Sequence, residues 1–143
     1  MSTRNCSAMS EEFGWPVRVY YEDTDAGGVV YYANYLKYME RARTEWLRAL
    51  GFEQDSLREE LGVIFAVRSV QVDYLKPARF NDALRVSADL VEARPASFSF
   101  VQRVMRGDVT LCEGRVGIVC LAADSFRPQA LPAALLKRLR GEG

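Results

Sequence analysis

A chain of 143 residues, 49% of them hydrophobic and 27% charged, has the size and composition of one folded domain with its own core, not of a disordered chain. Lys and Arg together number 19, as do Asp and Glu, so the net charge is zero and nothing in these totals favours a nucleic-acid-binding protein. Histidine is absent, which excludes Ser-His-Asp and Cys-His catalysis and the common histidine-based metal sites.

The N-terminal residues and the cysteines indicate where the protein resides. Residues 1–14 are polar and mixed, without the basic and apolar regions of a signal peptide, and we expect a mobile extension before a single domain over 15–143. No apolar stretch approaches the ~20 residues of a membrane span. Cys6, Cys112 and Cys120 lack CxxC spacing, and an odd number without a secretory signal favours free thiols. We therefore expect a cytoplasmic protein with no integral membrane segment.

A strand followed by a long helix is predicted for the first third of the chain. Residues 17–22 alternate apolar and polar side chains, which predicts a strand. An apolar stripe at helical spacing then predicts a helix over about 32–50, closed by Gly51 at the position of a left-handed C-cap. The stripe consists of Tyr35, Met39, Ala42, Trp46 and Ala49. Because its apolar face is wide, this helix needs a broad surface to cover it, and a sheet is the natural candidate.

The rest of the chain is mostly typical of strands. Residues 53–61 predict a short second helix. Strand patterns then follow over 65–74, 84–92, 98–105 and 109–122. A hairpin turn is predicted at 106–108, and Pro132 opens a short C-terminal helix. This order predicts an α+β fold with one antiparallel sheet and a single long helix on one face. Its other face and its edges need cover, which predicts a homodimer at least.

The run over residues 21–35 carries the strongest functional signal. It places Asp25 at the end of a predicted strand, then the flexible pair Gly27 and Gly28, and then the start of the long helix. A carboxylate that faces a helix N-terminus can attack a carbonyl, or deprotonate a water for that attack, while free helix N–H groups hold the carbonyl oxygen. From spacing alone, the alternative that Asp25 only forms the turn stays open.

Four stretches carry a resemblance to a known family: YEDTDAGGVVY at 21–31, ERARTEWL at 40–47, VDYLKPA at 72–78 and DSFRP at 124–128. They resemble the hot-dog-fold acyl-CoA thioesterases, within them the 4-hydroxybenzoyl-CoA thioesterase-like group, and specifically its Tol–Pal-associated members. The resemblance covers roughly residues 17–135. It implies an antiparallel β-sheet wrapped around one long central α-helix, and assembly as a homodimer or homotetramer with active sites at subunit interfaces. It also implies no metal, and no cofactor beyond the coenzyme A or pantetheine arm of the substrate.

The resemblance also implies roles for individual residues of the motif. Asp25 matches the family's catalytic aspartate, which acts as nucleophile or as general base. Tyr32 stands where aromatic-thioester enzymes use a backbone N–H to bind the thioester oxygen. The Tol–Pal-associated group usually carries His there, so this chain departs from that group at Tyr32. Gly27, Gly28 and Val29 are expected to bind substrate, because the two glycines let the backbone approach the thioester closely.

Charged residues outside the motif are weaker candidates. Lys76 and Arg79, around Pro77, are candidate contacts for coenzyme A phosphates, although lone basic residues on a loop are usually only solvated. We interpret Asp23 as a hydrogen-bonded neighbour of the site and Glu40 as structural.

The resemblance implies an acyl-CoA thioesterase that releases a free acid and CoA. Two alternatives stay open: a thioesterase acting on acyl-carrier protein, and a non-catalytic module that binds acyl thioesters or carrier protein. A hot-dog dehydratase or hydratase is disfavoured, because those enzymes pair a carboxylate with a histidine and this chain has none. The sequence does not distinguish among acyl groups, between coenzyme A and carrier protein, or between dimer and tetramer.

Overall fold

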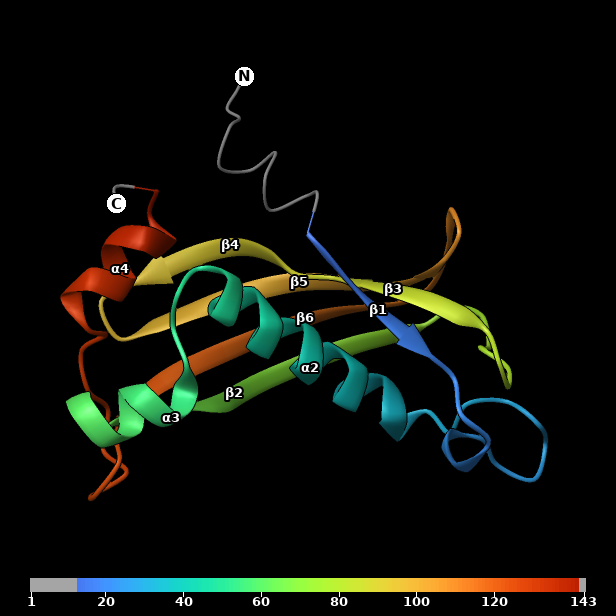
Figure 1. Ribbon diagram of the computed structural model, residues 1–143, viewed down its shortest axis with the longest axis horizontal. Coiled ribbons are helices and arrows are strands. Elements are labelled where there is room, and N and C mark those ends of the chain that lie inside the picture. The colour runs from blue at the N-terminus through green and yellow to red at the C-terminus, as the bar shows by residue number, and fades with distance from the viewer. Residues whose placement is uncertain (1–12, 142–143) are drawn as a thin grey trace.

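An antiparallel sheet forms the main layer of the computed structural model, which describes residues 13–141 (Figure 1). Within those residues the strand order is β1-β3-β5-β6-β2, and β4 also pairs with β5. The strands are β1 (Gly14–Arg18), β2 (Val63–Tyr74), β3 (Ala83–Ser87), β4 (Asp89–Arg94), β5 (Ser97–Arg106) and β6 (Val109–Ala122). The expected extension over 1–14 falls, for residues 1–12, outside the described part. Phe13 packs against the core, and Gly14 begins β1.

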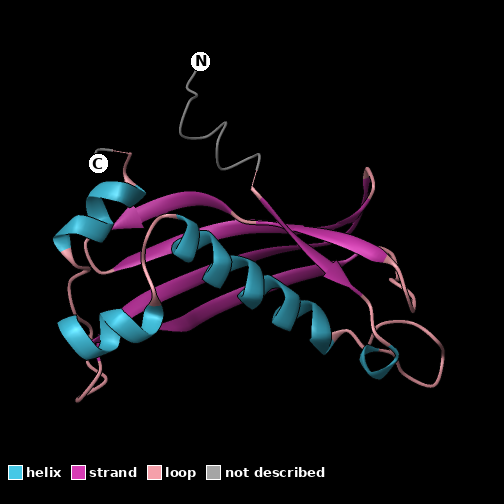
Figure 2. Cartoon of the chain, viewed as in Figure 1, coloured by secondary structure: helices cyan, strands magenta, loops and turns pink. Residues whose placement is uncertain are grey.

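The long helix α2 (Ala33–Ala49) lies across one face of the sheet (Figure 2). It matches the predicted helix to within one residue at each end, and Gly51 follows it in the left-handed conformation, with φ +97°. The buried residues of α2 are Tyr35, Tyr38, Met39, Ala42, Arg43, Trp46 and Leu47. Ala49, expected in the stripe, is exposed in the last turn. Among the described helices, none is both long and apolar enough to cross a membrane.

Short helical segments flank the sheet. They are the 3₁₀ turn η1 (Tyr21–Asp23), the helix α3 (Gln54–Ser56), the π-helical turn η2 (Leu57–Leu61) that continues it, and the C-terminal helix α4 (Ala133–Leu139). The first strand predicted over 17–22 therefore ends earlier than expected, at Arg18. The reason is local, because Asp23 Oδ2 accepts the backbone N–H of Tyr20 at 2.9 Å and so closes the 3₁₀ turn.

The strand predicted over 84–92 is two strands, β3 and β4. Both pair with the same neighbour, β5, in one register, and the pairing is interrupted at the fully buried Ala88 between them. Apolar and polar residues keep alternating through this interruption, so the sequence pattern does not reveal it.

Buried side chains fill the space between α2 and the sheet. Near the start of the helix, Tyr35 and Met39 belong to one cluster, and near its end Trp46 packs edge-on against Phe100 with ring centroids 5.1 Å apart. A glycine in β6 allows the helix to come close, since a Cβ at Gly114 would lie 3.0 Å from Met39 Sδ. The sheet wrapped on one long helix is the predicted α+β architecture.

Strand β2 forms one edge of the sheet. It pairs with β6 on one side, and within residues 13–141 no strand pairs with its other side. Val67 and Val70 in this strand are 50% and 44% exposed. A long edge strand with exposed apolar side chains favours pairing with another chain. The expected homo-oligomer stays a prediction.

Candidate functional site

A tight loop between η1 and α2 carries Asp25. The Asp25 N–H donates to the Val29 carbonyl at 2.9 Å, and the Gly28 N–H donates to the Asp25 carbonyl at 3.0 Å. Gly28 has φ +82°, a backbone conformation that residues other than glycine adopt only with strain. The two glycines that the sequence singles out therefore lie in the turn that holds Asp25 in place.

The Asp25 carboxylate is exposed at the surface of this loop. Its Oδ1 accepts the Gly27 N–H at 2.8 Å, and a Cβ at Gly27 would lie only 3.3 Å from that oxygen. Oδ2 accepts no hydrogen bond from any of the described residues. Asp25 thus does form the turn, as the alternative interpretation states, and it also keeps one carboxylate oxygen available for chemistry.

Tyr32 is the N-cap residue of α2, with φ −58° and ψ −29°. The first hydrogen bonds of the helix run from Asn34 N–H to the Tyr31 carbonyl (2.8 Å) and from Tyr35 N–H to the Tyr32 carbonyl (3.2 Å). The N–H groups of Tyr32 and Ala33 donate to no acceptor in the described part of the chain, and no side chain caps this helix end. These groups carry the positive end of the helix dipole.

The loop before β3 is joined to the Asp25 loop by backbone contacts. Val30 N–H donates to the Ala78 carbonyl at 2.8 Å, and Val29 pairs with Arg79 in an isolated bridge. Ala78 N–H in turn donates to the hydroxyl of Tyr35 at 2.9 Å. Burial is the main cause that raises the pKa of Tyr35, which keeps this hydroxyl protonated. The structure therefore places Arg79 beside Val29, a contact that the sequence alone could not predict.

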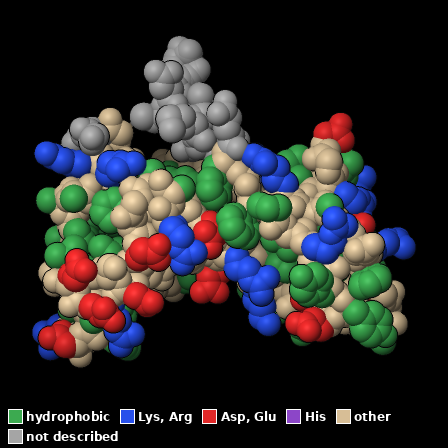
Figure 3. All heavy atoms as spheres, viewed as in Figure 1, with side chains coloured by type: hydrophobic (Ala, Val, Ile, Leu, Met, Phe, Trp, Pro, Cys, Tyr) green, Lys and Arg blue, Asp and Glu red, His purple; other side chains and the backbone are tan. Residues whose placement is uncertain are grey.

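Basic side chains lie at the same end of the molecule. Arg106 pairs with Asp82 at 2.9 Å, and the Asp82 carboxylate also accepts the Arg79 N–H at 2.8 Å. The charged groups of Lys76 and Arg79 are exposed, and neither forms an ion pair with another described residue. Figure 3 shows hydrophobic side chains interspersed with Lys and Arg over this end of the molecule.

An aromatic group surrounds the start of α2. The exposed Tyr31 and Tyr32 have ring centroids 4.8 Å apart, and Tyr74 at the end of β2 lies 5.7 Å from Tyr32 and 5.5 Å from Tyr35. The sequence predicts places for Tyr32 and Tyr35, whereas Tyr74 lies there only within the stretch 72–78 and has no predicted role. The available signal for Tyr74 is its place directly before the loop that carries Lys76.

Asp23 joins this loop to the helix. Its carbonyl accepts the Tyr31 N–H at 3.0 Å and the side-chain amide of Asn34 at 2.9 Å. The hydroxyl of Tyr38 is buried, and burial, followed by the negative charge of Asp23, raises the pKa of Tyr38. These contacts agree with a structural role for Asp23. Residues 13–141 contain no group of three or more His, Cys, Asp or Glu side chains arranged to hold a metal ion.

Comparison with known proteins identifies the family. A model of the thioesterase-like superfamily matches residues 19–139. The chain belongs to the thioesterase-like superfamily. The acyl-CoA thioesterase YbgC of Haemophilus influenzae is 46% identical to this thioesterase over 120 residues, which are 84% of this chain and 88% of the relative. The acyl-CoA thioester hydrolase YbgC of Escherichia coli O157:H7 is 45% identical over 129 residues, covering 90% and 96%.

Solved structures of similar proteins share the fold. A probable thioesterase from Bartonella henselae has a TM-score of 0.80 at 31% identity, covering 83% of this chain and 98% of that one. A hypothetical protein from Thermus thermophilus reaches a TM-score of 0.85 at 29% identity, covering 92% and 100%. The hot-dog fold and the family resemblance found in the sequence are therefore confirmed, and the enzyme class is that of a thioester hydrolase.

Proposed function

We propose that this hot-dog thioesterase hydrolyses acyl-CoA thioesters to a free acid and CoA. The observation that carries the proposal is the loop geometry, in which an exposed carboxylate lies seven residues before the start of α2. Within residues 13–141, one oxygen of this carboxylate and the N–H groups of Tyr32 and Ala33 have no hydrogen-bond partner. The names of the YbgC relatives support the choice of acyl-CoA, because identity of 45–46% extends over most of both chains.

In the proposed reaction, the N–H groups of Tyr32 and Ala33 bind the thioester oxygen and stabilise the negative charge that develops on it. Asp25 then acts in one of two ways. As a nucleophile, it attacks the carbonyl carbon, expels the thiolate, and forms an anhydride that water hydrolyses. As a general base, it takes a proton from water as the oxygen attacks, and the leaving thiolate is protonated afterwards. Because both routes use the same carboxylate oxygen, either one requires Oδ2 to be unpartnered.

Substrate contacts follow from the surroundings of Asp25. Gly27, Gly28 and Val29 present backbone to the thioester with little side-chain bulk, since two of the three are glycines. Lys76 and Arg79 are the proposed partners of the CoA phosphates, because their charges are exposed and form no ion pair with the residues that the structure describes. The hydroxyl-lined aromatic group around Tyr74 is the proposed contact for the acyl or pantetheine part.

Acyl-carrier protein is a second candidate as the donor of the thioester. Exposed apolar side chains continue around the basic loop at Tyr21 (79%), Leu75 (56%) and Phe80 (56%). Apolar side chains mixed with Lys76 and Arg79 offer more surface than a small thioester alone covers, and such patches mark protein contacts. A purely non-catalytic binding module would not need the Asp25 carboxylate.

The proposed assembly follows from the edge strand β2, and the proposed cytoplasmic location follows from the cysteines. Because no described strand pairs with the outer side of β2, the proposed assembly is a homodimer or a homotetramer. Cys112 and Cys120 are free, buried thiols, as a reducing cytoplasm would keep them.

The test is thiol release from acyl-CoAs of short, long and aromatic acyl groups. Turnover of at least one member supports the proposal and identifies the preferred acyl class. If none is hydrolysed, the same acyl groups are presented on acyl-carrier protein. Hydrolysis only there transfers the function to the second candidate, and no hydrolysis with either donor contradicts both.

A further inference from the structure

The loop between β2 and β3, residues 75–82, carries both basic candidates for the CoA phosphates and yet has a buried centre. Lys76 and Arg79 are exposed, whereas Ala78 between them is completely buried. Connecting segments normally run over the surface, because buried backbone N–H and carbonyl groups need hydrogen-bond partners. The partners of Ala78 therefore determine how this loop lies.

Both backbone groups of Ala78 are bonded to the elements that carry the proposed chemistry. Its N–H donates to the hydroxyl of Tyr35, in the first turn of α2, at 2.9 Å, and its carbonyl accepts the Val30 N–H of the Asp25 loop at 2.8 Å. Val30 contributes through its backbone, whereas Tyr35 contributes through its side chain. The hydrogen bond from the loop to α2 can therefore be removed by a substitution that deletes a single oxygen atom.

The two ends of the loop are held by the sheet. Near its start, the Lys76 N–H donates to the Leu111 carbonyl of β6 at 3.0 Å. At its end, the Asp82 carboxylate accepts the Arg79 N–H at 2.8 Å and pairs with Arg106 of β5 at 2.9 Å. These contacts fix the loop to the sheet, and they leave its position relative to α2 to the contacts at its centre.

Tyr35 is itself held in one orientation. It is only 3% exposed, and its ring centroid lies 5.5 Å from that of Tyr74 and 6.1 Å from that of Tyr38. An aromatic ring packed against two others has little freedom to turn, and a buried hydroxyl normally keeps its hydrogen bond. Because it is buried, Tyr35 acts on a bound substrate through the loop and not by direct contact.

We propose that Tyr35 is a positioning residue for the CoA arm of the substrate. Its hydroxyl fixes the centre of the loop relative to α2, so that Lys76 and Arg79 meet the phosphates while the thioester lies at the helix N–H groups. The inference rests on the proposed function, because that function assigns Lys76 and Arg79 to CoA, and it adds the contact that joins the phosphate contacts to the place of reaction. A thioester that lacks the phosphates should therefore not depend on the Tyr35 hydroxyl.

The test compares Tyr35→Phe with the wild type on two thioesters of one acyl group, that of CoA and that of pantetheine, which has no phosphate. For acyl-CoA, the variant is expected to raise KM about three- to tenfold and to keep kcat within about twofold, because the charge-assisted phosphate contacts weaken while the reacting groups stay in place. For acyl-pantetheine, both constants should stay within about twofold of wild type. An equal change in KM for the two substrates, or no change for either, would overturn the proposal.

Failure of this proposal differs from failure of the proposed function. A wild-type protein that hydrolyses no acyl-CoA removes the proposed function, and the role of Tyr35 with it. An active wild type whose KM values are unchanged in Tyr35→Phe removes only the role of Tyr35.

Amide hydrogen exchange of the protein without substrate tests the hydrogen bond itself. The Ala78 N–H should exchange at least about tenfold faster in Tyr35→Phe than in the wild type, because it loses its acceptor. Equal exchange rates would contradict the proposal. If Tyr35→Phe does not fold, the wild type decides, since an Ala78 N–H that exchanges as fast as an unbonded amide would also overturn it.

A combined variant shows whether Tyr35 acts through the basic residues of the loop. In a background with Lys76→Gln and Arg79→Gln, acyl-CoA should already have a raised KM, and adding Tyr35→Phe should change that KM by less than about twofold. An undiminished effect of Tyr35→Phe in this background would overturn the proposal, because the hydroxyl would then act by another route.

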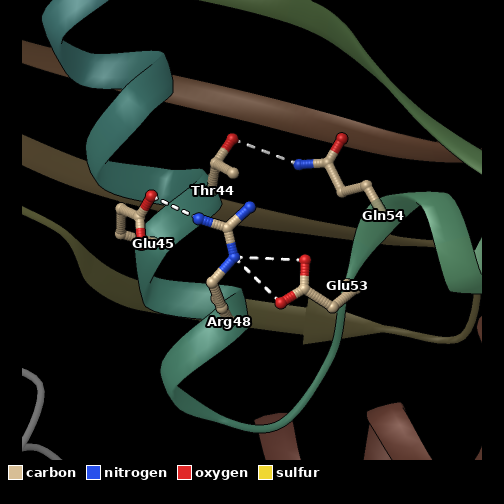
Figure 4. Close-up of polar contacts among 5 residues, drawn as sticks. All are labelled: Thr44, Glu45, Arg48, Glu53 and Gln54. Atoms are coloured by element: carbon tan, nitrogen blue, oxygen red, sulfur yellow. Dashed lines mark hydrogen bonds and ion pairs between the residues drawn. The ribbon is translucent and has the colours of Figure 1, made fainter.

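A control at the other end of α2 separates positioning from a general loosening of the helix. Figure 4 shows Arg48 between Glu45, at 2.6 Å, and Glu53, at 2.9 Å. Arg48 is thirteen residues from Tyr35, or about 20 Å along the helix. Arg48→Met removes both ion pairs without touching the loop, so the ratio of the two KM values should stay within about twofold of wild type. A ratio that changes as it does in Tyr35→Phe would overturn the specific role of Tyr35.

Discussion

Substitution of Asp25 by Asn separates the chemistry of the loop from its shape. The Asn side chain has the same size, and its amide oxygen can accept the Gly27 N–H that now reaches Oδ1 at 2.8 Å. The turn and the helix N-terminus should therefore persist, and the unfolding transition should move little. What disappears is the negative charge on the second oxygen, which is both the proposed nucleophile and the proposed base.

The expected loss of rate is about 10²–10⁴-fold in kcat, the usual contribution of a positioned acid–base group, which corresponds to about 3–5 kcal/mol of transition-state stabilisation. Activity should not vanish, because the N–H groups of Tyr32 and Ala33 remain. The assay is thiol release from the best acyl-CoA of the panel, with circular dichroism and Tm as checks of folding. Glu22→Gln is the matched control, since Glu22 is an exposed carboxylate three residues away, and it should retain activity within about twofold. A kcat for Asp25→Asn within threefold of wild type would refute the role of this carboxylate.

Three further predictions concern backbone strain, packing and the cysteines. Gly28→Ala should lower the free energy of unfolding, measured in urea, by about 1 kcal/mol, because φ +82° strains any residue with a side chain although the surrounding space is open. It should also lower kcat as the Asp25 loop shifts. Unchanged stability would mean that the loop adopts another conformation in solution. Gly114→Ala should lower the free energy of unfolding by about 1–3 kcal/mol in the same measurement, because the new Cβ would lie 3.0 Å from Met39 Sδ. If that contact is the cause, adding Met39→Leu to Gly114→Ala should change the size of the loss. Burial raises the pKa of Cys112 to about 12 and that of Cys120 to about 11, so in a Cys6→Ser background neither thiol should react with a disulfide reagent at pH 8 until urea is added. Since the folded state holds these protons more tightly than the unfolded state, the contribution of the two thiols to stability should be constant below about pH 8.5 and fall as the pH rises above it. Rapid labelling of the native protein would contradict their burial.

Local patterns in the sequence determined several elements of this fold correctly. The stripe through Tyr35, Met39, Ala42 and Trp46 predicted α2 to within one residue at each end, because apolar spacing records which face of a helix is buried. Gly51 marked the end of the helix for a reason of backbone geometry, its φ of +97°. The position of Asp25 before a helix N-terminus was also readable, since both features lie within a few residues of each other.

Contacts between distant segments were decided only by the tertiary structure. The alternation over 84–92 hid the interruption at Ala88, because β3 and β4 pair with one neighbour in the same register and the side-chain pattern does not change there. Arg43 is a charged residue whose burial the sequence does not reveal, because its partner inside the core is Gln102, fifty-nine residues later, whose Oε1 accepts a hydrogen bond from it.

The candidate site divides in the same way. The sequence by itself determined the Asp25 loop and the start of α2, which are made of consecutive residues and obey local backbone rules. Only the tertiary structure placed Arg79 against Val29 and Tyr74 beside Tyr32, because strand pairing and ring packing join segments that lie more than forty residues apart. The local sequence thus determines the loop that holds Asp25, whereas the packing of the sheet on α2 determines which side chains surround that loop.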